Sequence, residues 1–216
     1  MATNPNAPAS RRKRRDTDLR KLPTQKRSLE RYERMLASAA ALLEEEGYDN
    51  LKTVTIAERA GVPVGSVYQF FPNKYAILTV LVERWLAADN DALAEVEARR
   101  DAYETVVDEF VDLARGLVEA YKTQRALLAI VSLIRSIPEL QETTEVHDKQ
   151  YARRLAKIME RHGLKAGPAE KLALAGYFTI IVDAAGMSIA TETRRRAALK
   201  TRFLLDSVRD LFTRYL

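Results

Sequence analysis

The sequence predicts an all-α protein, and three observations support that prediction. Apolar residues recur at three- and four-residue intervals over most of the chain from residue 28 onward, which is the spacing of one face of an α-helix. No strand-like alternation and no Asn-Gly hairpin turn interrupts this pattern. Residues that stop or start helices separate the periodic segments, namely Gly47, Pro63, Pro72, Pro138, Gly163 and Pro168.

About nine helices follow from this spacing. The first is amphipathic and runs from Ser28 to Gly47, a candidate for a left-handed C-cap. Two short helices, at 55–60 and about 64–71, flank a tight turn, and a long helix from Lys74 to about 96 has Asn73 available as its N-cap. The remaining predicted helices are at about 102–121, 124–136, 139–162, 168–190 and 194–215.

Composition argues against enzymes and metal proteins. The 216 residues include no Cys and two His, which excludes disulfides, thiolate metal sites and a Cys nucleophile. No phosphate-binding loop, dinucleotide-binding motif or nucleophile elbow is present, so we expect no catalytic residue and no cofactor. Glu145, His147 and Asp148 lack the spacing of metal ligands. Without an apolar secretory signal at the N-terminus, the expected location is the cytoplasm.

The positive charge of the chain is concentrated at its beginning. Residues 1–27 carry nine Lys and Arg against Asp16 and Asp18, a net charge of +7, whereas residues 28–84 carry −2 and residues 85–216 are neutral. Few large apolar residues accompany this charge, so we expect a disordered arm. The arm either adds affinity for nucleic-acid phosphates or is simply a solvated leader. Its basic run is Arg11, Arg12, Lys13, Arg14 and Arg15.

A helix-turn-helix pattern lies between the two short predicted helices. Ala57, Gly61 and Val67 have the spacing A-x3-G-x5-V. A small residue allows the second helix to cross at Ala57, glycine permits the positive φ of the turn, and Val67 anchors the second helix in a shared core. The pattern therefore predicts a helix-turn-helix, which is typical of DNA-binding proteins.

The surrounding sequence adds a more specific signal. Ile56-Ala-Glu-Arg-Ala-Gly-Val-Pro-Val-Gly-Ser-Val-Tyr-Gln-Phe-Phe-Pro-Asn-Lys74 resembles the DNA-binding signature of the TetR (tetracycline-repressor) family, which reads roughly I-A-x-x-A-G-V-s-x-G-[ST]-[LV]-Y-x-[HY]-F-x-[NS]-K. The resemblance covers about residues 28–78. Beyond them the chain resembles the family in length, helix count and two apolar final helices.

This resemblance implies a recognition helix at 64–71 that enters the major groove. Gln69 has the chemistry to pair with adenine, Val64 to pack on a thymine methyl, and the Tyr68 and Ser66 hydroxyls to reach phosphate. Lys52 and Val54 stand where the family commonly has a Ser or Thr cap and a polar base-reading residue, which argues against base readout by the first short helix. The implied DNA contacts are Thr53, Val64, Gly65, Ser66, Tyr68, Gln69 and Lys74.

The resemblance also implies an effector cavity in the larger domain. Asp183 stands out because a carboxylate within an apolar run must be paired, hydrated or protonated. It could bind a cationic ligand group, pair with Arg135, or reach across a dimer interface. The candidate effector residues, whose aromatic members could equally be core, are Trp85, Tyr103, Phe110, Tyr121, Arg135, His147, Tyr151, Tyr177, Phe178, Asp183 and Met187.

The two final helices are unusually apolar. Residues 172–190 contain Asp183 as their only charge and approach the length of a membrane span, but a central Asp and many small residues favour a helix buried on two sides. Together with the helix at 194–215 they suggest one half of a four-helix homodimer interface. Small residues for close approach are Ala173, Gly176, Ala184 and Gly186, and candidate anchors are Phe203 and Phe212.

The sequence therefore predicts a basic arm at 1–27, a three-helix DNA-binding domain with a helix-turn-helix at 28–76 and a helical effector-binding and dimerisation domain at 77–216. The expected function is a homodimeric, ligand-responsive transcriptional regulator, a repressor that a small-molecule effector releases from a palindromic double-stranded DNA operator. No membrane partner is expected. Two alternatives remain: a DNA-binding regulator controlled by a protein partner without an effector, and an all-α enzyme that contains a helix-turn-helix.

Overall fold

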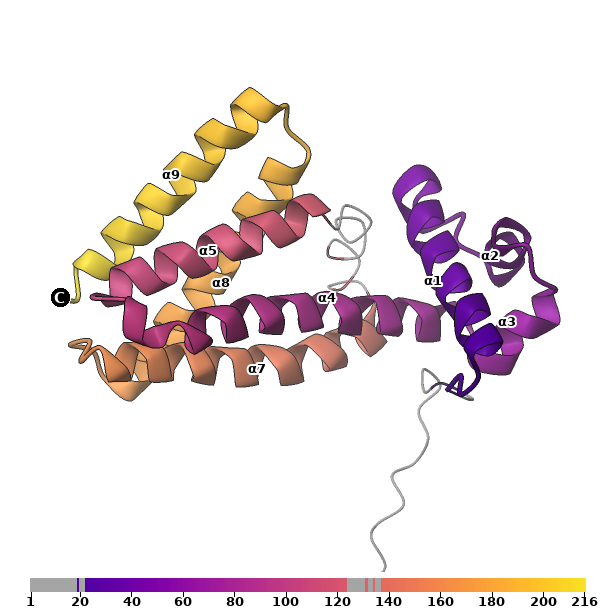
Figure 1. The fold of residues 1–216 in the computed structure, drawn as a ribbon, viewed down its shortest axis with the longest axis horizontal. Coiled ribbons are helices and arrows are strands. Elements are labelled where there is room, and N and C mark those ends of the chain that lie inside the picture. The colour runs from indigo at the N-terminus through magenta and orange to yellow at the C-terminus, as the bar shows by residue number, and fades with distance from the viewer. Residues whose placement is uncertain (1–18, 20–21, 124–130, 132–133, 135–136) are drawn as a thin grey trace, which may run out of the picture.

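The predicted all-α fold is confirmed. The computed structural model describes residues 19, 22–123, 131, 134 and 137–216, and the regular elements within these ranges are eight α-helices and one 3₁₀ turn. The molecule is elongated, with α1, α2 and α3 at one end and α5, α7, α8 and α9 at the other (Figure 1). The basic run of the arm and most of the predicted helix at 124–136 lie outside the described residues.

The first three helices share one core. These are α1 (Lys26–Glu46), α2 (Thr53–Ala60) and α3 (Val64–Phe70). Gly61 adopts the left-handed conformation, with φ 64° and ψ 41°, so its predicted role in the turn is confirmed. Gly47 has a positive φ of 77°, but its ψ of 179° shows that it is not the predicted left-handed C-cap. The stacked rings of Tyr32 and Phe71, 5.1 Å apart, close this core from α1.

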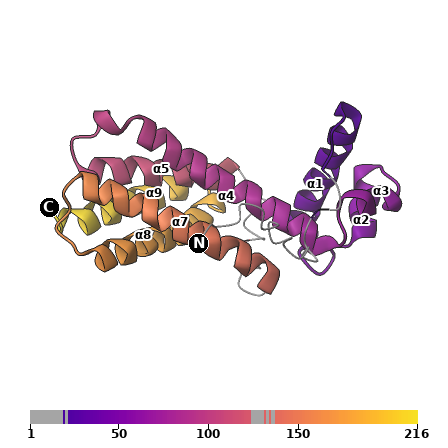
Figure 2. The same ribbon diagram turned by 90° about the horizontal axis from the view of Figure 1, so that it is seen from below.

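The long helix α4 (Lys74–Ala98) belongs to two cores at once. It begins as predicted at Asn73, whose side-chain oxygen accepts a hydrogen bond from the Ala76 amide at 3.0 Å. Its first half packs with α1–α3 through side chains such as Leu81, and its second half joins the other core through Leu93. In both views α4 runs continuously from the small helices into the larger bundle (Figures 1 and 2).

The second core is formed by α5 (Val106–Thr123), α7 (Pro138–Arg161), α8 (Pro168–Ala190), α9 (Arg194–Thr213) and the end of α4. α5 packs against α4, α8 and α9, and α7 packs against α4 and α8. Phe110 lies between Phe178 and Phe212, with ring centroids 4.9 Å and 4.0 Å away. Aromatic contacts of this kind stabilise a core beyond the burial of their area.

The start of α5 differs from the prediction. A 3₁₀ turn (Arg100–Ala102) comes first, and the α-helix begins at Val106 instead of residue 102. The Thr105 hydroxyl accepts a hydrogen bond from the Asp108 amide at 3.2 Å, which is the geometry of an N-cap. A capping threonine therefore sets this boundary more strongly than the apolar spacing on which the prediction depended.

The apolar helix α8 lies within the bundle. In the described part of the chain it is the helix that is long and apolar enough, by length and composition alone, to cross a membrane. It contacts α5, α7 and α9, and its face toward them includes the fully buried Ala175, Phe178 and Val182. These contacts bury one side of α8 in the bundle, whereas Leu172, Tyr177 and Ile180 are exposed, so within this chain α8 is not buried on two sides as predicted.

Candidate functional site

The turn between α2 and α3 has the geometry of a helix-turn-helix. The Val62 amide donates to the Ala57 carbonyl at 3.0 Å, and the Gly61 amide donates to the Glu58 carbonyl at 3.2 Å, so both amides close the end of α2. Val67 is fully buried among α1 and α2, which fixes the rotation of α3 about its axis. One face of α3 is therefore held in the core and the opposite face is presented outward.

The outward face of α3 contains most of the predicted base-contacting residues. Gly65, Tyr68 and Gln69 are exposed and Val64 is half-buried. Ser66 is the exception. This residue is only 8% exposed, so its hydroxyl does not lie open for the predicted phosphate contact.

Two side chains beside α3 are positioned by contacts that the sequence did not reveal. The Thr53 and Tyr68 hydroxyl oxygens are 2.9 Å apart, which links the first residue of α2 to the outward face of α3. The Lys74 ammonium lies 4.0 Å from the centre of the Tyr48 ring. This cation–π contact holds Lys74 in the first turn of α4, where free helix amides also favour an anion. The surface thus combines hydroxyls, an amide side chain and a fixed cation.

A second group of predicted residues converges inside the larger bundle. Trp85 of α4 lies edge-on to Tyr121 of α5, with ring centroids 6.4 Å apart. His147 and Tyr151 of α7 stack at 5.3 Å. The Asp183 carboxyl of α8 lies beside the Tyr121 hydroxyl, although their arrangement falls short of full hydrogen-bond geometry. Four helices therefore contribute to one polar cluster.

The remaining predicted effector residues lie elsewhere. Tyr103 donates a hydrogen bond to Asp112 at 2.6 Å near the start of α5. Phe110 and Phe178 fill the aromatic core, and Tyr177 is 54% exposed on the outside of α8. The resemblance implies a cavity in the larger domain, but the position of an aromatic residue along a helix does not distinguish a cavity from a core or a surface. Met187 packs against the core formed with α1–α3, and Arg135 lies outside the described residues.

Asp89 belongs to the polar cluster but was missed from sequence. It is 6% exposed on α4, one turn after Trp85, so it continues the apolar stripe of that helix. A carboxylate on a predicted core stripe was the available signal, the same one that identified Asp183. Burial, followed by the charge of Asp183, raises the pKa of Asp89 well above its usual value, and burial raises the pKa of Asp183 to about 7.

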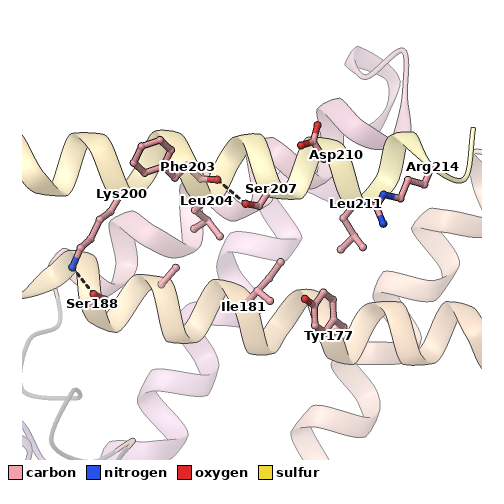
Figure 3. A pocket seen from close by; sticks show the side chains of 11 residues that line it. Tyr177, Ile181, Ser188, Lys200, Phe203, Leu204, Ser207, Asp210, Leu211 and Arg214 are labelled. Atoms are coloured by element: carbon pink, nitrogen blue, oxygen red, sulfur yellow. Dashed lines mark hydrogen bonds between the residues drawn. The ribbon is translucent and has the colours of Figure 1, made fainter.

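The outer surface of α8 and α9 carries a groove of about 570 Å³ with large exposed apolar side chains. Figure 3 shows Phe203 on α9 and Tyr177 and Ile181 on α8 along this groove. Lys200 closes one end by donating to Ser188 at 2.7 Å (Figure 3). The exposed apolar side chains of the two helices are Leu172, Tyr177, Ile180, Leu199 and Phe203.

Two residues expected at this surface lie inside instead. A side chain on Gly186 would meet the Tyr121 ring at 2.5 Å, so this glycine permits close approach of α8 to α5 within the chain. Phe212 is fully buried against Phe110, which removes it as an anchor for a partner. Both positions face inward because α8 and α9 each use one side to cover α5.

Comparison with known proteins agrees with these features. The profile of the family "Bacterial regulatory proteins, tetR family" matches residues 35–81, which run from α1 into α4. The HTH-type transcriptional repressor KstR of Rhodococcus jostii is 38% identical over 55 residues, and this match spans 26% of either protein. The sequence similarity to that curated relative is thus confined to about a quarter of its length.

Solved structures extend the likeness to the whole fold. A TetR-family regulator from Syntrophomonas wolfei has a TM-score of 0.70 at 18% identity, over 86% of this chain and 96% of that one. The regulator FadR from Bacillus subtilis, solved in complex with stearoyl-CoA, has a TM-score of 0.65 at 19% identity, over 84% and 97%. The matched profile and the helix-turn-helix geometry agree that residues 35–81 are similar to the DNA-binding part of the TetR family of bacterial regulatory proteins, and the fold of the chain is that of the solved TetR-family structures.

Proposed function

We propose that this protein is a homodimeric transcriptional regulator, a repressor that binds a palindromic DNA operator in the cytoplasm and is released by a small-molecule effector. The outward face of α3, held by the buried Val67 and the left-handed Gly61, is the observation that carries the proposal. A short helix fixed in this way can enter the major groove with its exposed side chains toward the base edges. No catalytic step is required.

The DNA-binding part of the proposal assigns different roles to Gln69 and Lys74. Gln69 is exposed on α3 and would read one base pair, whereas Lys74 would contact phosphate from the start of α4. With a duplex selected by the full chain from a random library, Gln69→Ala is expected to lower affinity by about 1–3 kcal/mol and relax preference at one position. Lys74→Ala is expected to weaken selected and random duplexes alike.

Fluorescence anisotropy against every single-base variant of the selected duplex measures both effects. The matched control is Glu58→Ala, an exposed change on α2 that leaves the outward face of α3 untouched. A Gln69→Ala protein that keeps the wild-type preference at every position would remove this residue from base readout. If the wild-type chain enriches no duplex from the library, the proposed function is wrong.

The dimer is supported by the apolar groove on α8 and α9. Tyr177, Ile180 and Phe203 are each more than half exposed, which is unusual for large apolar side chains. Burial against a second copy of the same surface would cover them and would place two α3 helices together, as a palindrome with half-sites about 34–36 Å apart requires.

The effector part is supported by the position of α4. This helix carries Trp85 and Asp89 in the interior polar cluster and Lys74 at the proposed DNA surface. Two hydrogen bonds from Arg84 to Glu33, at 2.8 Å and 2.7 Å, connect α4 to α1. A ligand that moves α4 would therefore move α1–α3 with it, and the spacing of the two α3 helices in a dimer would change.

A further inference from the structure

The buried acids of the larger bundle fall into two kinds. Glu109 is fully buried on α5 and is paired, because one of its oxygens accepts from Arg161 and lies 2.7 Å from His162 Nε2. Asp89 is 6% exposed and Asp183 is half-buried, yet among the described residues no Lys or Arg forms an ion pair with either of them. A buried carboxylate without a cation is costly unless it is protonated or a charged ligand is bound.

The basic residue on the adjoining face of α7 is already engaged. Arg154 donates to Glu97 at 3.2 Å and 2.6 Å and to Asn90 at 2.8 Å, so three of its donor groups are directed toward α4. Its charge reaches Tyr151, but it forms no ion pair with Asp89 or Asp183. Among the residues that the structure describes, the interior cluster therefore has more acidic than basic side chains.

Three further polar groups in the cluster have unmet hydrogen bonds. Tyr121 and Tyr151 are each 3% exposed, and neither hydroxyl has a hydrogen-bond partner among the described residues. The Tyr121 hydroxyl lies beside Asp183, and the strongest charge acting on the Tyr151 hydroxyl is that of Asp89. His147 Nε2 is also buried and unpartnered. Buried polar atoms are rarely left unpaired, so this pattern indicates a place for a ligand.

The chemistry of the cluster favours an organic cation over a metal ion. In the described part of the chain no group of three or more His, Asp and Glu side chains converges to hold a metal. Tyrosines adjoin the carboxyls instead, because Tyr121 lies beside Asp183 and the charge of Asp89 acts on Tyr151, and aromatic faces attract a positive charge that has lost its water. Trp85, Tyr121 and Tyr151 supply these rings from α4, α5 and α7.

We propose that Asp89 and Asp183 bind the positively charged group of an organic cation, whose apolar part lies against Trp85, Tyr121 and Tyr151. This assignment rests on the proposed effector function and names the chemical class of the effector. The carboxyls give the charge preference, the rings give contact area, and the Tyr121 and Tyr151 hydroxyls hydrogen-bond to polar atoms of the ligand.

Proton release accompanies binding in this arrangement. Burial raises the pKa of both carboxyls, and to about 7 for Asp183, so near neutral pH the empty site holds a proton on Asp183 that a bound cation displaces. The groups facing the pair are Asp148 and His147 of α7 and Tyr121 of α5, with Arg154 and Glu97 acting on Tyr151. The affinity for a permanently charged ligand should therefore rise as pH rises through 7, by up to about tenfold per pH unit for each proton released.

The test uses Trp85, the single tryptophan of the chain, as the reporter of the site. Its fluorescence is titrated with tetraphenylphosphonium and with the smaller benzyltrimethylammonium, two cations that do not titrate. Tetraphenylborate, which has the shape of tetraphenylphosphonium and the opposite charge, is the matched ligand control. We expect at least one cation to bind, at least tenfold more tightly at pH 8 than at pH 6, and tetraphenylborate to bind at least tenfold more weakly than that cation.

The variants Asp89→Asn and Asp183→Asn remove the charges without changing size. Each should weaken cation binding at least tenfold, and Asp183→Asn should flatten the pH dependence. The control is Asp91→Asn, an exposed change on α4 two residues from Asp89, which should bind as the wild type does. Circular dichroism melts confirm that each variant is folded, and Asn in place of a buried carboxylate should not lower Tm.

The outcomes separate this inference from the function on which it rests. If tetraphenylborate or stearoyl-CoA binds and releases DNA while both cations fail, the effector function stands and the cation assignment falls. Failure of every probe to bind or release DNA counts against both. If Asp183→Asn and Arg135→Gln each lower Tm and the double variant restores it, Arg135 is the partner of Asp183 and the cation site is overturned.

Discussion

Alanine at Gly61 and alanine at Gly65 are expected to change the stability of the protein in opposite directions, although the two glycines are four residues apart. Gly61 has a φ of +64° in the turn before α3, whereas Gly65 lies in the first turn of α3 without a positive φ. A side chain at either position would meet no other atom within 4 Å. The difference between the variants should therefore come from the backbone conformation alone.

The expected magnitudes follow from that conformation. An alanine forced into the left-handed region costs about 1–2 kcal/mol, and its reduced freedom in the unfolded chain offsets about 0.4–1 kcal/mol. Gly61→Ala should therefore lower the free energy of unfolding by about 1 kcal/mol, or Tm by about 2–4 °C for a chain of this size. Gly65→Ala should raise the free energy of unfolding by about 0.5 kcal/mol, because alanine favours the helix.

Urea unfolding followed by circular dichroism measures both changes, and DNA affinity separates stability from function. Gly65→Ala should bind the selected duplex more weakly than the wild type despite its greater stability, because its new methyl group stands on the face proposed to approach DNA. Gly61→Ala should bind normally under conditions in which it is fully folded. The reasoning fails if both variants shift in the same direction, or if Gly61→Ala is as stable as the wild type.

Three further predictions concern other parts of the molecule. Deletion of residues 1–20 should weaken binding to matched and random duplexes alike and reduce the salt dependence of affinity, since the basic run would contact phosphates. If the dependence of affinity on salt concentration is unchanged, the arm does not contact DNA. Ala184→Arg, at an exposed position on α8, should yield monomers that no longer bind the operator, and sedimentation at micromolar concentration measures the oligomeric state. If this variant is still a dimer, the dimer interface does not include this part of α8. The raised pKa of Asp183 means that the folded state binds more protons than the unfolded state between pH 4 and about 7. Asp183 should therefore make stability without ligand fall as pH rises through this range, by at most about 4 kcal/mol, and Asp183→Asn should remove its share of the fall while that of Asp89, whose pKa is also raised, remains.

Much of the fold and the proposed DNA surface could be predicted because their signals are local. Helix periodicity, the Asn73 cap and the left-handed Gly61 each depend on a few neighbouring residues, and the structure reproduces all three. The start of α5 was placed incorrectly because capping by Thr105, also a local signal, was not considered. The dense helix-turn-helix signature is likewise contiguous, and the family profile matches the segment that contains it, at residues 35–81.

The sequence by itself determined which residues form helices and which segment carries the family signature. Only the tertiary structure decided which face of each helix is inside: it placed Phe212 and Gly186 in the interior, Tyr177 on the surface, and Asp89 beside Asp183. Helical spacing gives every amphipathic helix a buried side but does not say which helix covers it, because contacts between α4, α5, α7 and α8 join residues far apart in the chain. The interior polar cluster exists only through those contacts: local patterns could single out members such as Asp183, but they could not show which of the candidates lie together.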